Sequence, residues 1–307
     1  MLQEGLSLRV IARKLGRSPN SISLEIQLGL VKGVYDAKKA DHKAYIRRHE
    51  AKYQGMKIAE NRKLQEFVEA GLYDDLSPEA IAGRVVNREK DLPSVSKNSI
   101  RRYIKSVPGR RVEYHRIKQR RKRKRGRKRT KVTQLTDRTF VDKRPKSIQN
   151  RRYVGDVEAD FLVSGKTGRG IILSVVCRKL RISFLEQILE VTIENMHQAF
   201  LKIQERFPEL RSITTDNDLL FQKHKTLEKL LEVKIYFCHP YHSWEKGSVE
   251  NINRYVRKDI PKGTDISRYS KRFIKKLEAK LNRRYMAVLN YKTPQEVLHE
   301  YRKRKKH

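Results

Sequence analysis

Acidic and apolar residues alternate over residues 151–163, which read RRYVGDVEADFLV. Acids fill one register and apolar side chains the other: Asp156, Glu158 and Asp160 against Val157, Ala159 and Phe161. A period of two is typical of a β-strand, here with one apolar face and one carboxylate face. At about 3.3 Å per residue the outer two acids stand roughly 13 Å apart, so the three cannot share one metal site. Two interpretations remain open: a solvated edge strand paired with Arg151 and Arg152, or a metal or catalytic site.

Strand and helix patterns alternate through residues 151–290, which predicts an α/β domain. Strands are expected at 170–177, 181–185, 212–215 and 234–238, and a helix from Ile193 to Phe207 that ends before Pro208. The strand 212–215 carries Asp216 and Asn217 at its carboxyl end, where ligand-binding residues of α/β sheets usually emerge. A further helix at 248–258 has an inward stripe and a separate polar face: Val249, Ile252 and Val256 against Glu250, Asn253, Arg254 and Arg257.

Residues 1–31 contain the signals of a helix-turn-helix. Ser7 is the expected cap of a helix that turns Ile11 and Leu15 inward, and Gly16 suits the turn. The pair Ser18-Pro19 then starts a second helix, as in units whose second helix enters a major groove. The candidate DNA-reading side chains lie near its leading edge: Arg17, Asn20 and Ser21. An ordinary helical hairpin remains the alternative.

Residues 32–106 predict a second, mostly helical region with its own helix-turn-helix. A charged helical stretch over 32–72 is followed by two start signals, Ser77-Pro78 and Ser96. The second of these opens a helix whose candidate DNA-contacting residues are Lys97, Arg101 and Arg102. The N-terminal part of the chain is therefore expected to be all-α.

Charge indicates the kind of partner. The chain has 307 residues, with 72 Lys and Arg against 35 Asp and Glu, a formal net charge of +37. Such a field attracts polyanions, above all nucleic acid. A membrane partner is set aside because the sequence has no long apolar run or signal peptide. Cys177 and Cys238 lie far apart in apolar segments and are expected to be buried thiols in a reducing cytoplasm.

The most cationic segment lies in a linker expected at 107–150. Residues 108–131 include QRRKRKRGRKRTK and have few apolar anchors, so they are expected to stay unfolded without a partner. We expect them to follow a phosphate backbone, with candidate contacts at Arg120, Arg121, Lys122, Arg123, Lys124 and Arg125. A nuclear-localisation signal is the alternative interpretation of the same residues.

Three acids from distant parts of the α/β domain suggest metal chemistry: one from the first strand, Asp216 and Glu250. Gathering them costs free energy unless a cation compensates their charge. A pair of Mg²⁺ or Mn²⁺ ions would do so and would support phosphoryl chemistry without a covalent protein intermediate. Each acid taken singly is equally compatible with a helix cap or a surface residue.

Four motifs, GDVEAD, ITTDN, PYHSWEKGSVEN and PKGTD, together resemble the IS-thirty family of bacterial DDE transposases. That family belongs to the transposase and retroviral-integrase superfamily, which has a ribonuclease-H-like core. Thirty-three residues separate Asp216 from Glu250, the family's spacing. The resemblance covers nearly the whole chain, including the ending LNRRYMAVLNYKTPQEVL, whose Thr293 and Glu296 also form a capping box before the C-terminal helix and basic tail at 291–307.

The resemblance implies that Asp160, Asp216 and Glu250 are the catalytic acids and the ligands of two Mg²⁺ or Mn²⁺ ions. It selects Asp160 over the other acids of its strand, and it favours Glu250 over Glu245 for the third role. It further implies binding of terminal inverted repeats and of target DNA, action as a homo-oligomer, and a place in the bacterial cytoplasm on the nucleoid. For His242 and Trp244 we expect packing or substrate positioning; His239 and His242 alone suggest zinc, an interpretation set aside here.

Several positions depart from the family pattern. Val157 stands where the family usually has Trp, and Asp218 stands where it has Gly. Arg254, Tyr285 and Asn290 replace Gly, Pro and Gly. Met1 lies almost at the first helix-turn-helix, so a shortened first unit is expected.

These departures keep two other functions open. One is a relic transposase that acts only as a DNA-binding protein or repressor. The other is a ribonuclease-H-like nuclease acting on RNA–DNA hybrids, which the tandem duplex-reading motifs disfavour.

Overall fold

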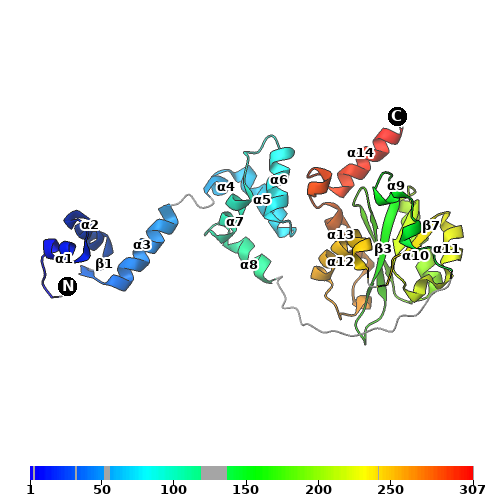
Figure 1. Cartoon of the computed structure of the whole chain (residues 1–307), viewed down its shortest axis with the longest axis horizontal. Helices are drawn as coiled ribbons and strands as arrows, with labels where there is room; N and C mark the ends of the chain where they lie inside the picture. The colour runs from blue at the N-terminus through cyan, green and yellow to red at the C-terminus, as the bar shows by residue number, and fades with distance from the viewer. Residues whose placement is uncertain (3, 32, 52–55, 119–136, 241, 307) are drawn as a thin grey trace. The chain divides into compact units, whose positions relative to one another are not determined.

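The computed structural model describes the chain except at residues 3, 32, 52–55, 119–136, 241 and 307 (Figure 1). The chain forms two compact units, residues 1–68 with 95–113, and residues 69–94 with 114–307. The domain boundaries expected from the sequence remain predictions.

The first unit is built mainly of short helices. Ser18 caps its second helix by accepting the backbone N–H of Ser21 at 3.1 Å, and Gly16 has the left-handed conformation (φ 61°) that the sequence predicts. Its elements are α1 (Leu8–Leu15), α2 (Pro19–Gly29), β1 (Leu30–Val31), β2 (Val34–Tyr35), α3 (Ala37–Ala51), α4 (Met56–Glu60) and α7 (Lys97–Lys105), while α5 (Arg62–Tyr73) crosses into the second unit.

The second unit contains a five-stranded mixed sheet with the order β5-β4-β3-β6-β7. β3, β4 and β5 run antiparallel, whereas β6 and β7 are parallel to β3. The strands are β3 (Asp156–Val163), β4 (Ile171–Cys177), β5 (Ser183–Ile188), β6 (Ser212–Thr215) and β7 (Lys234–Phe237). The α-helices are α6 (Pro78–Asn87), α8 (Arg110–Lys118, which begins in the first unit), α9 (Lys146–Gln149), α10 (Ile193–Arg206), α11 (His224–Leu231), α12 (Gly247–Asp259), α13 (Lys271–Asn282) and α14 (Pro294–Lys306). The 3₁₀ helices are η1 (Val141–Lys143), η2 (Leu219–Lys223), η3 (Ser243–Lys246), η4 (Ile266–Arg268) and η5 (Ala287–Leu289).

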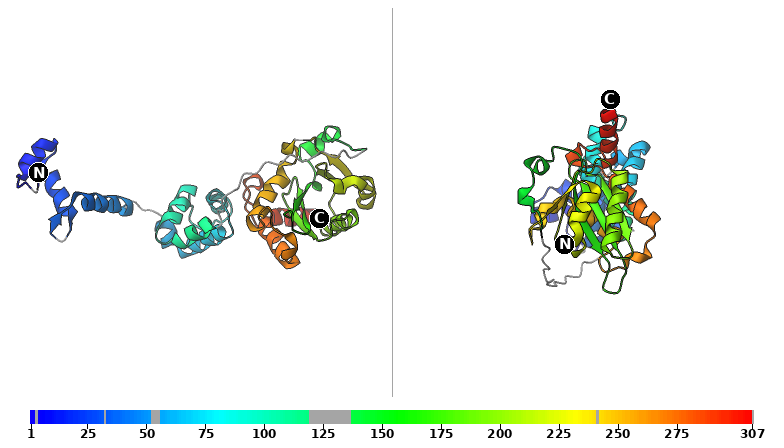
Figure 2. Two further views of the ribbon diagram at one scale, coloured as in Figure 1. Left: turned by 90° about the horizontal axis from the view of Figure 1, so that it is seen from below. Right: turned by 90° about the vertical axis from the view of Figure 1, so that its right-hand side faces the viewer.

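Helices cover both faces of this sheet (Figures 1 and 2). α10 and α11 pack on the face that contains Val157 and Ala159, both fully buried, as the strand pattern predicts. α12 and α13 pack on the opposite face, where Val249, Ile252 and Val256 form the expected inward stripe of α12. The α/β interpretation is therefore confirmed, and the acids of β3 share their face with α12.

The outer strand β5 is protected by α13. Asn282 accepts the backbone N–H of Ser183 and donates to its carbonyl oxygen, both at 2.8 Å, and Glu278 accepts the N–H of Leu185 at 2.6 Å. Unpaired edge groups of a sheet otherwise invite pairing with another chain. These side chains close the edge from within the same unit.

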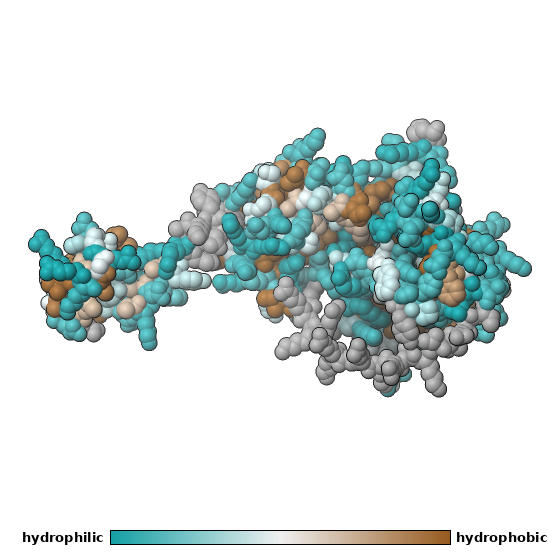
Figure 3. Space-filling model, viewed as in Figure 1, coloured by the Kyte–Doolittle hydropathy of each residue, from teal (hydrophilic) through white to brown (hydrophobic). Residues whose placement is uncertain are grey.

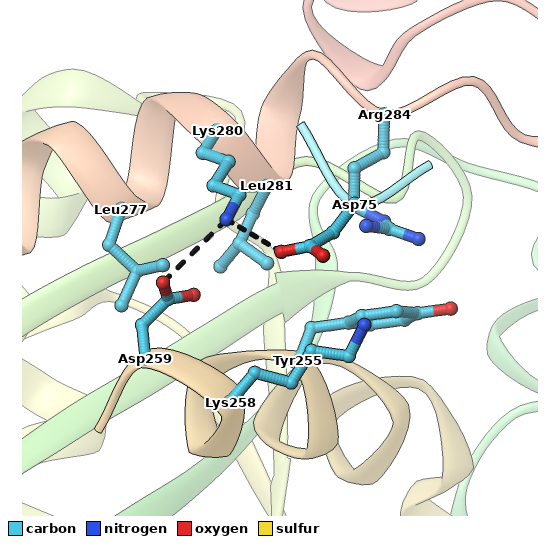
Figure 4. Close-up of a pocket in the computed structure, with 8 residues that line it drawn as sticks. All are labelled: Asp75, Tyr255, Lys258, Asp259, Leu277, Lys280, Leu281 and Arg284. Atoms are coloured by element: carbon cyan, nitrogen blue, oxygen red, sulfur yellow. Dashed lines mark hydrogen bonds and ion pairs between the residues drawn. The ribbon is translucent and has the colours of Figure 1, made fainter. Parts of the chain in front are cut away.

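Charged contacts also attach residues 69–94 to the rest of the second unit. Lys280 on α13 points between Asp75 and Asp259, at 3.0 and 3.6 Å, and the Arg284 guanidinium lies 3.7 Å from the ring centroid of Tyr255 (Figure 4).

α14 begins with the predicted capping box. Thr293 donates its N–H to Glu296, and Glu296 donates its own to the Thr293 hydroxyl.

Several expectations from the sequence are wrong. β3 is the central strand of the sheet, so the prediction of a solvated edge strand is wrong. The sequence could not show this, because an alternation of acids does not reveal how many strands flank the one that carries them. The N-terminal region is not all-α, since β1 and β2 pair as a short hairpin. Leu15 is exposed rather than inward, and the segment from 108 onward is not unfolded throughout, because Arg110–Lys118 is helical. The rest of the cationic run, at 119–136, lies outside the described residues.

Hydrophilic residues cover most of the surface in the view of Figure 3, with scattered hydrophobic patches. Among the helices that the structure describes, none is both long and apolar enough to cross a bilayer.

Asn282→Ala should destabilise the second unit by about 2–4 kcal/mol, because it leaves a buried N–H and a buried carbonyl without partners. Urea unfolding followed by fluorescence of the single tryptophan, Trp244, reports on this unit. As a matched control, Asn195→Ala removes an exposed side-chain bond to Glu190 and should cost less than about 0.5 kcal/mol. Equal effects of the two changes would contradict the role assigned to Asn282.

Candidate active site

The three acids of β3 share one face but have different partners. Asp156, 1% exposed, accepts a hydrogen bond from the Ser212 hydroxyl on the neighbouring strand β6, at 2.8 Å. This contact ties β3 to β6, whose carboxyl end leads to Asp216. Asp156 is therefore part of the scaffold.

Glu158 anchors the helix that carries Glu250. Its Oε2 accepts the backbone N–H groups of Ser248 and Val249, at 2.7 and 3.0 Å, in the first turn of α12. The first N–H groups of a helix lack partners within the helix, and the helix dipole favours an anion beside them. Arg178 adds a cation 3.7 Å from Oε1. Because Glu158 is almost fully buried, it fixes α12 on the central strand.

Asp160 and Asp216 both accept hydrogen bonds from one ammonium group, that of Lys246. Lys246 Nζ donates to Asp160 Oδ1 and to Asp216 Oδ2, each at 2.8 Å, and Asn253 donates to the second oxygen of Asp160 at 2.6 Å. Burial acts to lower the pKa of Lys246, but the two carboxylates outweigh it and raise that pKa above its ordinary value. A compact cation is thus strongly stabilised between the first two predicted acids.

Glu250 lies beside this pair, in the first turn of α12, and is half-buried. Desolvation raises the pKa of its carboxyl. Lys246 opposes that shift, and the negative charges of Asp160, Glu158 and Asp216 add to it. Acids from two strands and one helix are therefore brought within electrostatic range of one another.

The donor set suits a hard divalent cation. Asp216 Oδ1 is buried and has no hydrogen-bond partner within the described residues, so one carboxylate oxygen remains available. Carboxylate oxygens are the ligands that Mg²⁺ and Mn²⁺ prefer. Ligand atoms of Asp160, Asp216 and Glu250 do not all lie within 4.8 Å of one another in the part of the chain that the structure describes, so joint binding of such an ion by these acids stays a prediction.

Comparison with known proteins decides the family. The chain is 32% identical over 303 residues to "Transposase for insertion sequence element IS4351" of Bacteroides fragilis, covering 96% of this chain and 91% of that protein. It is 30% identical to "Transposase InsI for insertion sequence element IS30A" of Escherichia coli (strain K12), over 97% of this chain and 80% of that protein. The chain belongs to the IS30 family of transposases.

Other comparisons are less specific. "Transposase for insertion sequence element IS1086" of Cupriavidus metallidurans is 29% identical over 96% of this chain and 89% of its own length. Among solved structures, the catalytic core domain of BIV integrase aligns with 50% of this chain and 99% of its own, at 18% identity and a TM-score of 0.39. No protein-family model matches the chain.

Asp218, the departure two residues after Asp216, adds a second acid after the end of β6. It caps η2 by accepting the N–H of Leu220 at 2.9 Å. Desolvation, followed by the charges of Asp216 and Asp160, raises the pKa of its carboxyl. Its backbone is in the extended region (φ −74°), so this position does not need the glycine that the family resemblance leads us to expect there.

Glu245, the rival third acid, has other partners. It accepts the backbone N–H of His239 at 2.8 Å and contacts the His239 ring at 3.0 Å. Trp244 is 71% exposed, and its ring lies 4.5 Å from that of His242, so it packs on a neighbouring side chain at the surface. Substrate positioning by Trp244 stays a prediction.

Sequence reasoning missed three contributors: Lys246, Glu158 as a helix anchor, and Asn253 as a partner of Asp160. Asn253 stood on the predicted polar face of α12 beside Glu250, which was the available signal. Nothing local to Lys246 or Glu158 indicates their partners, because Asp160 and Asp216 lie 86 and 30 residues from Lys246, and Ser248 lies 90 residues from Glu158.

The predicted DNA-contacting residues of the helical regions are exposed where the structure describes them. They are Arg17, Asn20, Ser21, Lys97, Arg101 and Arg102. The six cations at 120–125 lie outside the described residues. DNA contact by either group remains a prediction.

Glu158→Gln should destabilise the second unit by about 1–3 kcal/mol, because it removes the charge from hydrogen bonds to a helix N-terminus and leaves Arg178 buried without its anion. Urea unfolding read from Trp244 measures the change. Glu194→Gln removes an exposed pair with Lys223 and should leave the midpoint unchanged. A Glu158→Gln protein as stable as the parent would rule out the anchoring role.

Asp218→Asn should raise the midpoint of thermal unfolding at pH 7 by about 1–3 °C in the presence of a chelator. The raised pKa means that the ionised carboxyl is disfavoured in the folded state. Its ionisation therefore lowers the free energy of unfolding as the pH rises from the unfolded-state pKa through the folded-state pKa. Asparagine keeps the cap without that charge. The gain over the parent should shrink as the pH falls toward about 4. A gain that is independent of pH would contradict this explanation.

Proposed function

We propose that this chain is a DNA transposase that cleaves the ends of an insertion sequence and joins them to target DNA by metal-assisted transesterification. The observation that carries the proposal is the meeting of Asp160 and Asp216 on one ammonium, with Glu250 within electrostatic range. Membership of the IS30 transposase family, and relatives named as transposases, support it.

Asp160, Asp216 and Glu250 would hold two Mg²⁺ or Mn²⁺ ions. When bound, such ions activate water or a 3′ hydroxyl and stabilise the oxygen that leaves the phosphorus. The protein's own task is to position these ligands. Asn253 orients Asp160 through its second carboxylate oxygen, while Glu158 keeps α12, and with it Glu250, on the central strand.

The remaining cations would hold DNA. The exposed side chains of the helix-turn-helix candidates, Arg17, Asn20 and Ser21 in the first and Lys97, Arg101 and Arg102 in the second, would read terminal inverted repeats. A net charge of +37 adds affinity that does not depend on base sequence and falls with salt. Cutting and joining paired ends calls for a homo-oligomer. A ribonuclease-H-like core for residues 151–290 is part of the same proposal.

A second candidate is a DNA-binding relic or repressor without turnover. The specific observation in its favour is Asp218, which brings an extra half-buried acid close to the proposed ligands.

The test incubates purified protein with Mn²⁺ or Mg²⁺ and labelled DNA carrying the element ends. Asp160→Ala, Asp216→Ala and Glu250→Ala should each reduce nicking and joining by about 10²-fold or more, the range for losing one electrostatic contact to a transition state. Glu205→Ala, at an exposed acid on α10, is the matched control and should keep activity.

Gel-shift binding to the same DNA should survive all four changes. Cleavage that persists in all three acid variants would refute the mechanism. Binding of the end DNA by the parent protein without any cleavage would favour the repressor.

A further inference from the structure

Two histidines and a glutamate converge in the loop between β7 and α12. His239 Nδ1 lies 3.0 Å from Glu245 Oε1, and His242 Nδ1 lies 3.7 Å from the same oxygen. One ligand atom from each of the three residues falls within 4.8 Å of the others. All three side chains belong to the second unit and are partly buried.

These distances fit ligands of one ion. Zinc bonds of 2.0–2.1 Å at tetrahedral angles place donor atoms about 3.3–3.4 Å apart, and the two observed separations bracket that value. The longer contact is too long for a hydrogen bond. His242 Nδ1 is buried and has no hydrogen-bond partner within the described residues. A hydrogen-bonded histidine–glutamate pair therefore accounts for His239 but not for His242.

A carboxylate behind the cluster fixes one of the rings. His239 Nε2 lies 2.8 Å from Asp142 Oδ2, on the side of the ring away from Glu245, and the ring stacks on Phe140 at 5.1 Å. A histidine that binds metal through one nitrogen commonly donates the other N–H to a carboxylate. Glu245 is fixed as well, because its Oε2 accepts the His239 backbone N–H at 2.8 Å.

We propose that His239, His242 and Glu245 form a binding site for a zinc-class transition-metal ion, separate from the three acids around Lys246. Two imidazoles and one carboxylate suit Zn²⁺, whereas the acid cluster offers only hard oxygen ligands. In the sequence, His239 and His242 alone suggest zinc but do not provide a complete ligand set. Glu245 and Asp142 are the contributions that only the fold reveals.

The site lies next to the proposed active site. Glu245 is followed by Lys246, whose ammonium bridges Asp160 and Asp216, and then by α12. An ion bound there would fix the end of β7 to the residue that precedes Lys246. The site would thereby restrain the loop from which Lys246 projects.

Cobalt titration of the full-length protein tests the proposal. Four-coordinate Co²⁺ absorbs strongly in the visible range, while six-coordinate Co²⁺ held by oxygen ligands absorbs weakly, and excess Mg²⁺ in the buffer occupies hard oxygen sites. We expect the four-coordinate bands to saturate at one Co²⁺ per chain and to disappear on addition of one equivalent of Zn²⁺.

Variants assign the bands. His242→Ser should abolish them, and Asp142→Asn should weaken the affinity for Zn²⁺ about 10- to 100-fold. His299→Ser, at an exposed histidine on α14, should leave both unchanged. Asp142 is 73% exposed, so its replacement tests the site without threatening the fold.

Three outcomes would overturn the proposal. They are absence of the bands in the parent protein, their persistence in His242→Ser, and thiolate-to-cobalt charge-transfer bands, which would place the ion on Cys238 instead.

Discussion

The central strand carries three carboxylates on a face that is covered by protein, and each needs a compensating partner. Buried anions are costly unless they are paired or hydrogen-bonded. Ser212 donates to one oxygen of Asp156, whose other oxygen has no hydrogen-bond partner within the described residues, while the first turn of α12 compensates Glu158 and Lys246 with Asn253 compensates Asp160. These partners come from β6, α12 and the loop before α12. The hydrogen bonds that these acids accept therefore hold β6, α12 and the segment before α12 together around the site.

This constraint gives neighbouring acids different roles. Asp156 and Glu158 are almost fully buried and bind protein groups, so they position β6 and α12. Asp160 is partly exposed and faces Asp216 across an ammonium. Only the acid farthest along the strand remains accessible to a substrate and an ion. The proposed chemistry thus depends on two acids that do not take part in it.

Local patterns predicted the elements, but long-range partners lay beyond them. The alternation in β3, the inward stripe of Val249, Ile252 and Val256 and the capping box at Thr293 followed from spacing alone. The choice of Asp160 came from family resemblance, because the alternating pattern places all three acids on the same face of the strand and does not distinguish them. The central place of β3 and the partners of Lys246 depend on segments dozens of residues away. The β1–β2 hairpin was missed because each strand has only two residues, and the helix α8 because charged residues interrupt its apolar pattern.

Three residues that depart from the family pattern fit their surroundings in backbone conformation or packing. Asn290 has a left-handed backbone (φ 52°), the conformation that suits the family's glycine and that asparagine tolerates better than most residues. Tyr285 lies 4.8 Å below the Arg84 guanidinium, and Val157 is fully buried in the sheet core. Asp218 differs, since it adds charge where the proposed ligands already repel one another. An added acid there raises the need for a bound cation.

Anomalous diffraction from a Mn²⁺-soaked crystal shows whether the three acids hold divalent ions. We expect manganese peaks within coordination distance of carboxylate oxygens of Asp160, Asp216 and Glu250, with the Lys246 ammonium displaced from between the first two. An ordered site in saturating Mn²⁺ with Lys246 still bridging Asp160 and Asp216, and no manganese on any of the three acids, would contradict it.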